Sequence, residues 1–355
     1  MKRVTDDLEP GRPIRMNDVA KAAGLSRTTV SLVLSGKAGP SIPEATRVRV
    51  RAVAAELGYV PNALASGLRR RTSDTLGLVS DVVATTPFAG EMLRGAQEVA
   101  WKARKVIIVV NTEGVPEMET AATRELVERR VEGLLVATMA HAIIEPPAVA
   151  GRLPIVLLNA RPRDGSLPSV VPDDHAGGRT ATAHLVAAGH RRIGYIVHPG
   201  GPAAEERFAG YREVLAEAGI PFDPALVAYG PGDAAGGVAA AGELLDRDDP
   251  PTAIFCFNDR MAMGAFRAAR RRGLTIPADL SIVGYDDHDV IAPWLDPPLT
   301  TVRLPHLEMG RWATEHLLAL VNGTIRPGSA PVAHREACPL VIRESVVAPR
   351  RRAGA

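Results

Sequence analysis

The stretch GLSRTTVSLVLSG, residues 24–36, sets polar side chains at helical spacing around a few apolar ones. A helix capped by Ser26 would bury Val30, Val33 and Leu34 and leave its opposite face open to a partner. That face carries Arg27, Thr28, Ser31 and Leu32. An arginine can donate to guanine O6 and N7 or to phosphate, and hydroxyls suit phosphate oxygens or base edges. The predicted chemistry is hydrogen bonding to a nucleic acid.

Leu32 is the apolar member of this face. It follows Thr28 by one helical turn, so on DNA it would pack against thymine methyl groups. Packing against the next helix of the same domain is the alternative, and the sequence leaves both open.

Residues 16–35, MNDVAKAAGLSRTTVSLVLS, have the spacing of a helix-turn-helix. Ala20 is small enough for two helices to pack closely, Gly24 permits a left-handed turn, and Val30 fills the core between the helices. The pattern predicts helices over about residues 17–23, from residue 26, and over about residues 43–57. The N-terminal residues of the second helix would then lie nearest the base edges of a major groove.

The charge is unevenly distributed along the 355 residues. Residues 1–72 hold 13 Lys or Arg against 6 Asp or Glu, whereas the remainder holds 29 against 34. A basic N-terminal part favours a polyanionic partner, although a solvated basic tail is the alternative. The composition, 46% hydrophobic and 23% charged, is typical of a globular chain with a large core.

From residue 75, apolar runs alternate with helical stretches. The runs are TLGLVSDVV, VIIVVN, VEGLLVA, LPIVLLN, RIGYIVH, TAIFCFND and LSIVGYDD. Such runs predict buried parallel strands in βαβ units. Because so many units are too many for one open sheet, we expect two doubly wound parallel-sheet lobes with a cleft between them. The fold class is therefore an N-terminal all-α head and an α/β body.

Polar residues follow these strands, where open α/β sheets bind ligands. They are Asn111, Asn159, His198, Asn258, Asp259, Asp286 and Asp287. Strand-end caps and hydrogen bonds between the lobes are the alternatives to ligand contacts.

Several kinds of site are disfavoured. The acidic run YDDHD consists of adjacent loop residues, which rarely converge on one metal ion, and HPGGP lacks the Lys-Ser/Thr of a phosphate-binding loop. Cys256 and Cys338 have no metal-ligand spacing, so we expect reduced structural thiols. Neither a signal segment nor a membrane span is visible, so we expect a cytoplasmic protein without cofactors or membrane contact.

The chain resembles the LacI–GalR (lactose and galactose repressor) family of transcription regulators from residue 16 to about 348. The resemblance rests on DVAKAAGLSRTTVSLVL, ELGYVPNALASGL, LGLV, TPFAGEMLRG, HLVAAGHRRIGYI, RFAGYREVL, AIFCFNDRMAMGA, LSIVGYDD, DPPLTTVRLP and LVIRES. The family usually has arginine at Leu32, so the DNA sequence recognised is expected to differ. Arg15 and Pro43 also stand where the family often has Thr and Ser caps.

The resemblance implies a set of DNA contacts. They are Asn17, Ser26, Arg27, Thr28, Thr29, Ser31, Leu32, Asn62, Ala65 and Leu68. In the family, hinge helices of two subunits pair in the minor groove, and Leu68 matches the leucine that opens the central base step. Packing of Leu68 on the body is the alternative. Gly67 suggests a hinge helix that orders on DNA.

The resemblance also implies an effector cleft of periplasmic sugar-binding type. Its expected residues are Phe88, Asn159, Arg207, Asn258 and Asp286. Arg207 would fork onto two ligand oxygens, Asp286 would accept from hydroxyls, and Phe88 would stack on the ligand. One arginine with Asp and Asn suits a polyhydroxylated molecule such as a sugar or nucleoside.

The predicted organisation has five parts. They are a disordered extension (1–15), the helix-turn-helix domain (16–60), a hinge helix (61–73), the effector-binding and dimerisation domain (74–348) and a basic tail (349–355). Lobe one would take about 74–172 and 302–330, and lobe two about 175–299 and 336–348. The expected function is an effector-controlled repressor that binds a near-palindromic operator as a homodimer. A sugar-binding protein without a DNA role, or a sugar- or nucleoside-acting enzyme, is the alternative.

Overall fold

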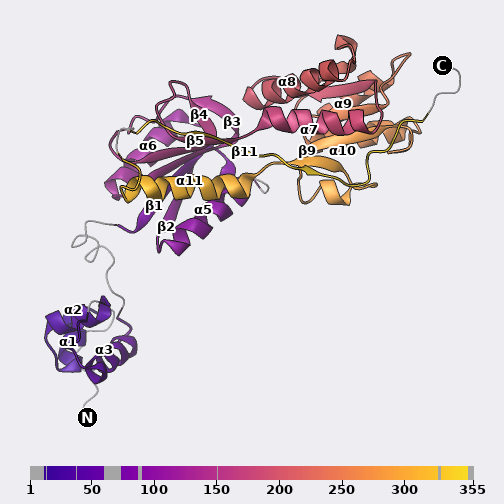
Figure 1. Ribbon diagram of the computed structural model, residues 1–355. Coiled ribbons are helices and arrows are strands. Elements are labelled where there is room, and N and C mark those ends of the chain that lie inside the picture. The colour runs from indigo at the N-terminus through magenta and orange to yellow at the C-terminus, as the bar shows by residue number, and fades with distance from the viewer. Residues whose placement is uncertain are drawn as a thin grey trace. The chain divides into compact units, whose positions relative to one another are not determined.

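The computed structural model describes residue 12 and residues 14–36, 38–59, 73–86, 90–149, 151–326 and 329–350. The chain forms two compact units, Met1–Ser73 and Asp74–Ala355 (Figure 1). Each unit has its own hydrophobic core. Within the described ranges, no helix combines the length and apolar character needed to cross a membrane.

Three helices form the N-terminal unit: α1 (Met16–Ala23), α2 (Arg27–Leu34) and α3 (Glu44–Glu56). Their core consists of Val19, Ala20, Ala23, Val30, Val33, Val50 and Ala54. Ser26 caps α2, because its Oγ accepts a hydrogen bond from the Thr29 backbone N–H at 3.1 Å. Gly24 has a left-handed φ of 63° in the turn before it. The predicted helix-turn-helix is confirmed.

Two described residues of the predicted disordered extension contact the helical unit. We expected residues 1–15 to be disordered, but Ile14 packs against the core and Arg12 Nη2 donates to Asp18 Oδ1 at 2.9 Å. The other Asp18 oxygen accepts from the Arg15 backbone N–H at 2.7 Å, which closes the first turn of α1. Composition does not reveal such pairings, which is why the prediction was wrong here. The rest of that stretch lies outside the described residues.

Lobe one of the second unit is built on a six-stranded parallel sheet with the order β11-β5-β4-β3-β1-β2. Its strands are β1 (Thr75–Ser80), β2 (Val106–Asn111), β3 (Leu134–Ile144), β4 (Ile155–Pro162), β5 (Ser169–Pro172) and β11 (Ala333–Glu336). Helices α5 (Gly90–Lys102) and α11 (His306–Val321) cover one face, and α6 (Pro116–Glu128) packs on the other.

Lobe two has a second six-stranded sheet, with the order β12-β10-β9-β8-β6-β7, in which only β12 is antiparallel. Its strands are β6 (Ile193–Val197), β7 (Val227–Tyr229), β8 (Ala253–Cys256), β9 (Ser281–Asp286), β10 (Thr300–Arg303) and β12 (Leu340–Val341). Helices α7 (Asp174–Ala187) and α8 (Pro202–Glu217) lie on one face, and α9 (Ala234–Leu245) and α10 (Asp259–Arg271) on the other. Single turns of 3-10 helix are η2 (Val83–Thr85), η3 (Pro224–Leu226) and η4 (Ala292–Trp294).

Three segments connect the lobes. The first runs from β5 into α7, as predicted. The second follows Arg303 instead of falling at 299–302, because β10 extends the lobe-two sheet beside β9. The third follows Glu336 instead of falling at 330–336, because β11 pairs with β5 in lobe one. β10 and β11 are too short to contain the apolar runs from which strands were predicted, so the predicted lobe boundaries were wrong by several residues.

Candidate functional site

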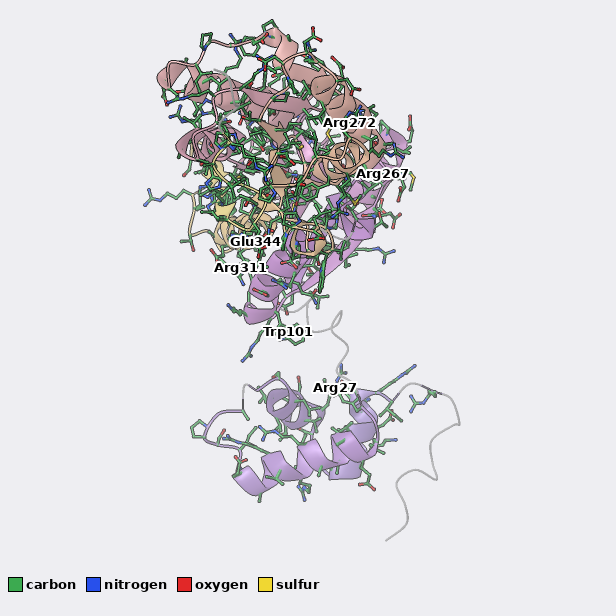
Figure 2. The ribbon with its side chains drawn as sticks, turned by 90° about the vertical axis from the view of Figure 1, so that its right-hand side faces the viewer. Arg27, Trp101, Arg267, Arg272, Arg311 and Glu344 are labelled. Carbon is green, nitrogen blue, oxygen red and sulfur yellow. The ribbon has the colours of Figure 1, made fainter. Side chains whose placement is uncertain are left out.

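The exposed face of α2 carries the residues predicted to contact DNA. Ser26, Arg27 and Thr28 are exposed at its N-terminal end, and Figure 2 shows Arg27 on the surface of the helical unit. Thr29 and Ser31 are half-buried, and Thr29 Oγ1 lies 2.9 Å from Ser26 Oγ. An arginine and hydroxyls at the open end of a helix form an arrangement that can enter a major groove.

Leu32 lies on the same surface with 37% of its area exposed. It is not among the residues of the core that joins the three helices, and its two alternatives, contact with DNA and packing against α3, both stay predictions. Asn17, at the start of α1, is also exposed. Asn62, Ala65 and Leu68 lie outside the described residues, so their DNA contacts stay predictions.

A cavity of about 310 Å³ lies between the lobes, near the carboxyl ends of several strands. Four of the five predicted effector residues line it: Asn159, Arg207, Asn258 and Asp286. The fifth, Phe88, lies outside the described residues. The cavity wall also contains His141, His198, Phe257 and Arg260, which the sequence analysis did not select as ligand contacts.

An irregularity in the sheet forms the lobe-one wall. The pairing of β3 with β4 shifts register, so that residues 138–141 lie opposite Asn159 alone. The Asn159 Nδ2 donates to Thr138 O and to Met139 O, both at 3.0 Å, and so holds the irregular segment in place. These two bonds fix the orientation of the amide, and its acceptor Oδ1, which is buried, has no partner among the described residues.

His141 comes from the same irregular segment and reaches lobe two. Its Nδ1 lies 3.0 Å from Oδ2 of Asp174, a fully buried residue at the start of α7. Burial alone would raise the pKa of Asp174, but Arg207 and His141 outweigh it and hold the pKa below its ordinary value. The side chains can meet because Gly178 of α7 lies directly against the backbone of Arg207, where a Cβ would collide.

Arg207 is 4% exposed and is largely committed to the protein. Its Nε donates to Asp174 Oδ1 at 2.8 Å and its Nη1 donates to Phe257 O at 2.7 Å. The guanidinium carbon lies 3.5 Å from the centroid of the Tyr285 ring, a cation–π contact. One N–H of Nη1 and both N–H groups of Nη2 remain for a ligand, so the expected fork onto two ligand oxygens stays a prediction.

Asp286 ends β9 in a backbone conformation that is unusual for a non-glycine residue, with φ 110°. Strained positions of this kind cluster at ligand sites. Burial raises the pKa of Asp286 to about 7, although Arg207 and Arg260 act in the opposite direction. No described residue forms a side-chain hydrogen bond with its carboxylate, which lines the cavity.

Asn258 caps a helix, which is the alternative to a ligand contact. Its Oδ1 accepts from the Met261 backbone N–H at 2.8 Å, which caps α10. Its Nδ2 donates to Gly232 O at 3.0 Å. Asn258 thus lines the cavity with both polar atoms already bonded.

Three buried polar atoms in the cavity wall have no hydrogen-bond partner among the described residues: His141 Nε2, Asn159 Oδ1 and His198 Nδ1. Buried polar atoms are normally bonded, so such a group points to a ligand or water. His198 directly follows β6, a position that the sequence had marked as polar. His141 gave no such signal, because nothing in the sequence reveals that β3 turns irregular before it.

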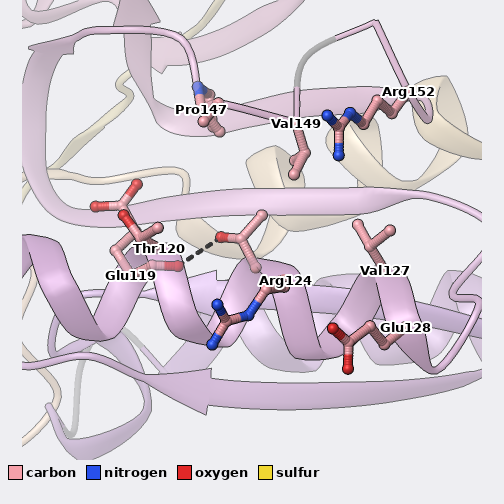
Figure 3. A pocket seen from close by; sticks show the side chains of 10 residues that line it. Glu119, Thr120, Arg124, Val127, Glu128, Pro147, Val149 and Arg152 are labelled. Atoms are coloured by element: carbon pink, nitrogen blue, oxygen red, sulfur yellow. Dashed lines mark hydrogen bonds between the residues drawn. The ribbon is translucent and has the colours of Figure 1, made fainter.

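A second cavity, of about 400 Å³, lies on lobe one between α6 and residues 147–152 (Figure 3). Its hydroxyls serve the helix: Thr123 Oγ1 donates to Glu119 O at 2.7 Å and Thr120 Oγ1 donates to Pro116 O at 3.0 Å. None of the residues described in its wall has a buried polar atom without a partner. The interlobe cavity is therefore the better candidate, although it is smaller.

His141, Asp174 and Glu206 place ligand-type atoms within 4.8 Å of one another, which raises the question of a metal ion. Glu206 already accepts from Arg161 at 3.0 Å and from Arg335 at 2.7 Å. Since guanidinium groups neutralise both carboxylates, this cluster is an ion-pair network that links the lobes.

Two family models match the chain. The model described as bacterial regulatory proteins, lacI family, matches residues 15–62, and a periplasmic binding protein-like domain matches residues 182–346. The HTH-type transcriptional repressor PurR of Photobacterium profundum is 35% identical over 310 residues, which are 86% of this chain and 92% of that protein. The regulator GalR of Escherichia coli is 35% identical over 318 residues, which are 88% and 90%.

Solved structures agree with this result. The lac repressor dimer bound to operator and the anti-inducer ONPF has a TM-score of 0.80 at 28% identity, over 95% of this chain and 100% of that one. The complex of the transcriptional regulator CelR with cellobiose has a TM-score of 0.67 at 32% identity, over 94% and 100%. With relatives of this identity aligned along most of both chains, the protein belongs to the lacI family of bacterial regulatory proteins.

Proposed function

We propose that this protein is a transcriptional repressor that reads its operator with the exposed face of α2. The observation that carries the proposal is that Arg27, Thr28 and Leu32 stand exposed on a helix whose other face is buried. Arg27 donates to guanine or phosphate, Thr28 contacts a base edge, and Leu32 packs on thymine methyls. Two copies read the two halves of a near-palindromic operator. Asn62, Ala65 and Leu68 act in the minor groove between these halves.

The interlobe cavity takes the effector, a sugar or nucleoside that is bound and not transformed. In support of this, the cavity wall combines a positive Arg207, an Asp286 carboxylate and buried atoms without protein partners. Asn159 and Phe88 complete the set of proposed contacts. Effector binding reorients the lobes and thereby changes operator affinity, a coupling that is typically worth about 1–3 kcal/mol.

The homodimer forms through lobe one. β2 is an edge strand of its sheet, and Val106, Ile108 and Val109 are exposed along it at 60%, 36% and 41%. Trp101, at the end of α5, adds an indole that is 74% exposed (Figure 2). An uncovered apolar edge strand is an aggregation hazard unless a partner covers it. A second copy suits it, since a near-palindromic site requires two heads.

Selection of genomic fragments with the purified full-length protein, followed by footprinting, tests this function. We expect a protected near-palindromic site whose footprint changes when sugars or nucleosides are added. Leu68→Ala should weaken binding to that site more than it weakens non-specific binding, because only the specific complex contains an opened base step. Failure to enrich any site, with and without an extract of cell metabolites, would contradict the proposal.

A further inference from the structure

His141 is one of the residues that join the two lobes. It belongs to β3 of lobe one and is 5% exposed, and its Nδ1 contacts Asp174 Oδ2 of lobe two at 3.0 Å. Its other ring nitrogen, Nε2, is buried in the cavity wall without a partner among the described residues. One side chain of the cavity wall therefore contacts the opposite lobe through one ring nitrogen and has a second, buried ring nitrogen that no described residue bonds.

The surroundings fix the hydrogen-bonding character of this ring. A carboxylate can only accept, so His141 Nδ1 carries the hydrogen that meets Asp174. The charge of Asp174 is already matched by the Arg207 guanidinium, which donates to it at 2.8 Å. In the neutral tautomer that has this hydrogen on Nδ1, Nε2 offers a lone pair.

Two further residues of the cavity wall, Asn159 and Asp286, carry hydrogen-bond acceptors. The Asn159 amide nitrogen donates to Thr138 O and Met139 O. This orientation leaves the acceptor Oδ1 without a partner among the described residues. Across the cavity lies the Asp286 carboxylate, a further acceptor. Leaving buried acceptors unpaired is costly. A ligand that brings several hydrogen-bond donors removes this cost, whereas a ligand that offers only acceptors does not.

We propose that His141 Nε2 accepts a hydrogen bond from a hydroxyl or N–H group of the effector, and that His141 thereby selects donor-rich, uncharged ligands and links them to Asp174 in the other lobe. The inference rests on the proposed function in taking the interlobe cavity as the effector site. Sugar hydroxyls and nucleobase N–H groups share the required chemistry, and the experiment separates them.

Two substitutions divide the ring's two roles. In His141→Asn, the amide nitrogen takes the place of Nδ1 and can still donate to Asp174, but nothing remains at the position of Nε2. In His141→Gln, the longer side chain restores a polar atom near Nε2 and gives up the bond to Asp174. His334→Asn, at a half-buried position outside the cavity wall, serves as the matched control.

Calorimetric titration of the full-length protein with D-ribose, D-galactose, cellobiose, adenosine and inosine measures the effect. We expect at least one probe to bind, His141→Asn to weaken it about tenfold or more, and His141→Gln and His334→Asn to stay within about threefold. Binding of a free sugar identifies the donor as a hydroxyl, and binding of the nucleosides without free D-ribose shows that the base is required as well. Unchanged affinity in His141→Asn, or no binding of any probe to the wild type, overturns the inference.

Nitrogen NMR of the free wild-type protein provides a test that does not depend on whether the variants fold. We expect the His141 ring to carry its hydrogen on Nδ1 at neutral pH, with Nε2 unprotonated. A doubly protonated ring, or a hydrogen on Nε2 alone, overturns the inference. Footprinting of the same samples keeps the two proposals apart: a protected operator without the expected histidine behaviour rejects only the role of His141, whereas loss of the wild-type footprint rejects the repressor function.

Discussion

The helical unit and the interlobe cavity place their polar residues in opposite environments. Arg27 and Thr28 are exposed on α2, over a core to which they do not contribute. Arg207 is 4% exposed, and it holds a buried carboxylate, a backbone carbonyl and an aromatic ring. A residue that reads DNA can therefore be substituted without changing the stability of the fold, whereas a substitution in the cavity wall changes it.

The difference has a physical origin. DNA is a large polyanion that meets a convex helix from outside, so its contacts must be exposed. A small ligand gains affinity only where water is excluded, so its contacts must be buried, and buried polar groups require partners. The partners of Arg207 and His141 are therefore supplied from distant parts of the chain.

The largest expected effect comes from Arg207→Ala. It leaves the Asp174 carboxylate buried without its cation, which should lower the free energy of unfolding of the α/β unit by about 3–5 kcal/mol. Urea unfolding followed by tryptophan fluorescence measures this, because all three tryptophans lie in that unit. Combining Arg207→Met with Asp174→Asn should recover part of the loss. An unchanged unfolding midpoint in Arg207→Ala would show that the cavity residues, like those on the exposed face of α2, do not contribute to stability.

Arg27→Ala should weaken DNA binding and leave the stability of the protein unchanged. Loss of a contact to guanine or phosphate should weaken operator binding by about 1–3 kcal/mol, while the free energy of unfolding changes by less than about 0.5 kcal/mol. Fluorescence anisotropy with labelled operator and a thermal melt of the same sample measure both quantities. Arg51→Ala, with a side chain that is 60% exposed on α3, is the control. Equal losses of operator affinity in the two variants would mean that Arg27 acts only through its charge.

One carboxylate in each unit should also respond to pH with opposite sign. The folded pKa of Asp286 is about 7, above its ordinary 3.8, so its contribution to stability is present at acid pH and is lost as the pH rises toward 7. Asp286→Asn should therefore gain in melting temperature relative to the wild type as the pH rises from below 4 to 8. A constant difference in melting temperature across this range would argue against the raised pKa.

Asp18 in the helical unit provides the counterpart. Its pKa is lowered, first by the Arg15 backbone hydrogen bond, so its stabilising contribution is present above its ordinary 3.8 and is lost as the pH falls. Asp18→Asn should cost stability at neutral pH and progressively less in acid, in contrast to Asp286→Asn.

The smallest effect is expected from Leu32→Ala. Because Leu32 is 37% exposed and is not named among the core residues of the helical unit, the melting temperature should move less than in a core variant such as Val30→Ala. Binding should weaken by up to about 1 kcal/mol, and only on operators with thymine at the contacted step. Base-by-base substitution of the operator checks this. A lower melting temperature with unchanged base preference would support the packing role of Leu32.

The helical unit was predictable from the sequence because its determinants are local. Ser26 caps α2 through Thr29, three residues away, and Gly24 turns the chain at its own position. Leu32 faces outward because the helical period places it beside Thr28. Ile14 and Arg12 escaped prediction because they join this core from a stretch whose composition is typical of disorder.

In the α/β unit, the sequence by itself determined the long strands and the polar residues that follow them, because apolar runs and turn residues record where strands lie and end. The burial predicted for VIIVVN was wrong, because β2 is an edge strand with exposed Val106, Ile108 and Val109.

Only the tertiary structure decided what the polar residues do. It used both polar atoms of Asn258 in a cap, paired Arg207 with Asp174 across a close helix contact, and let an irregular strand carry His141 into the cavity. The physical reason is that the role of a buried polar group is set by its partners, and the fold brings these partners from distant parts of the chain.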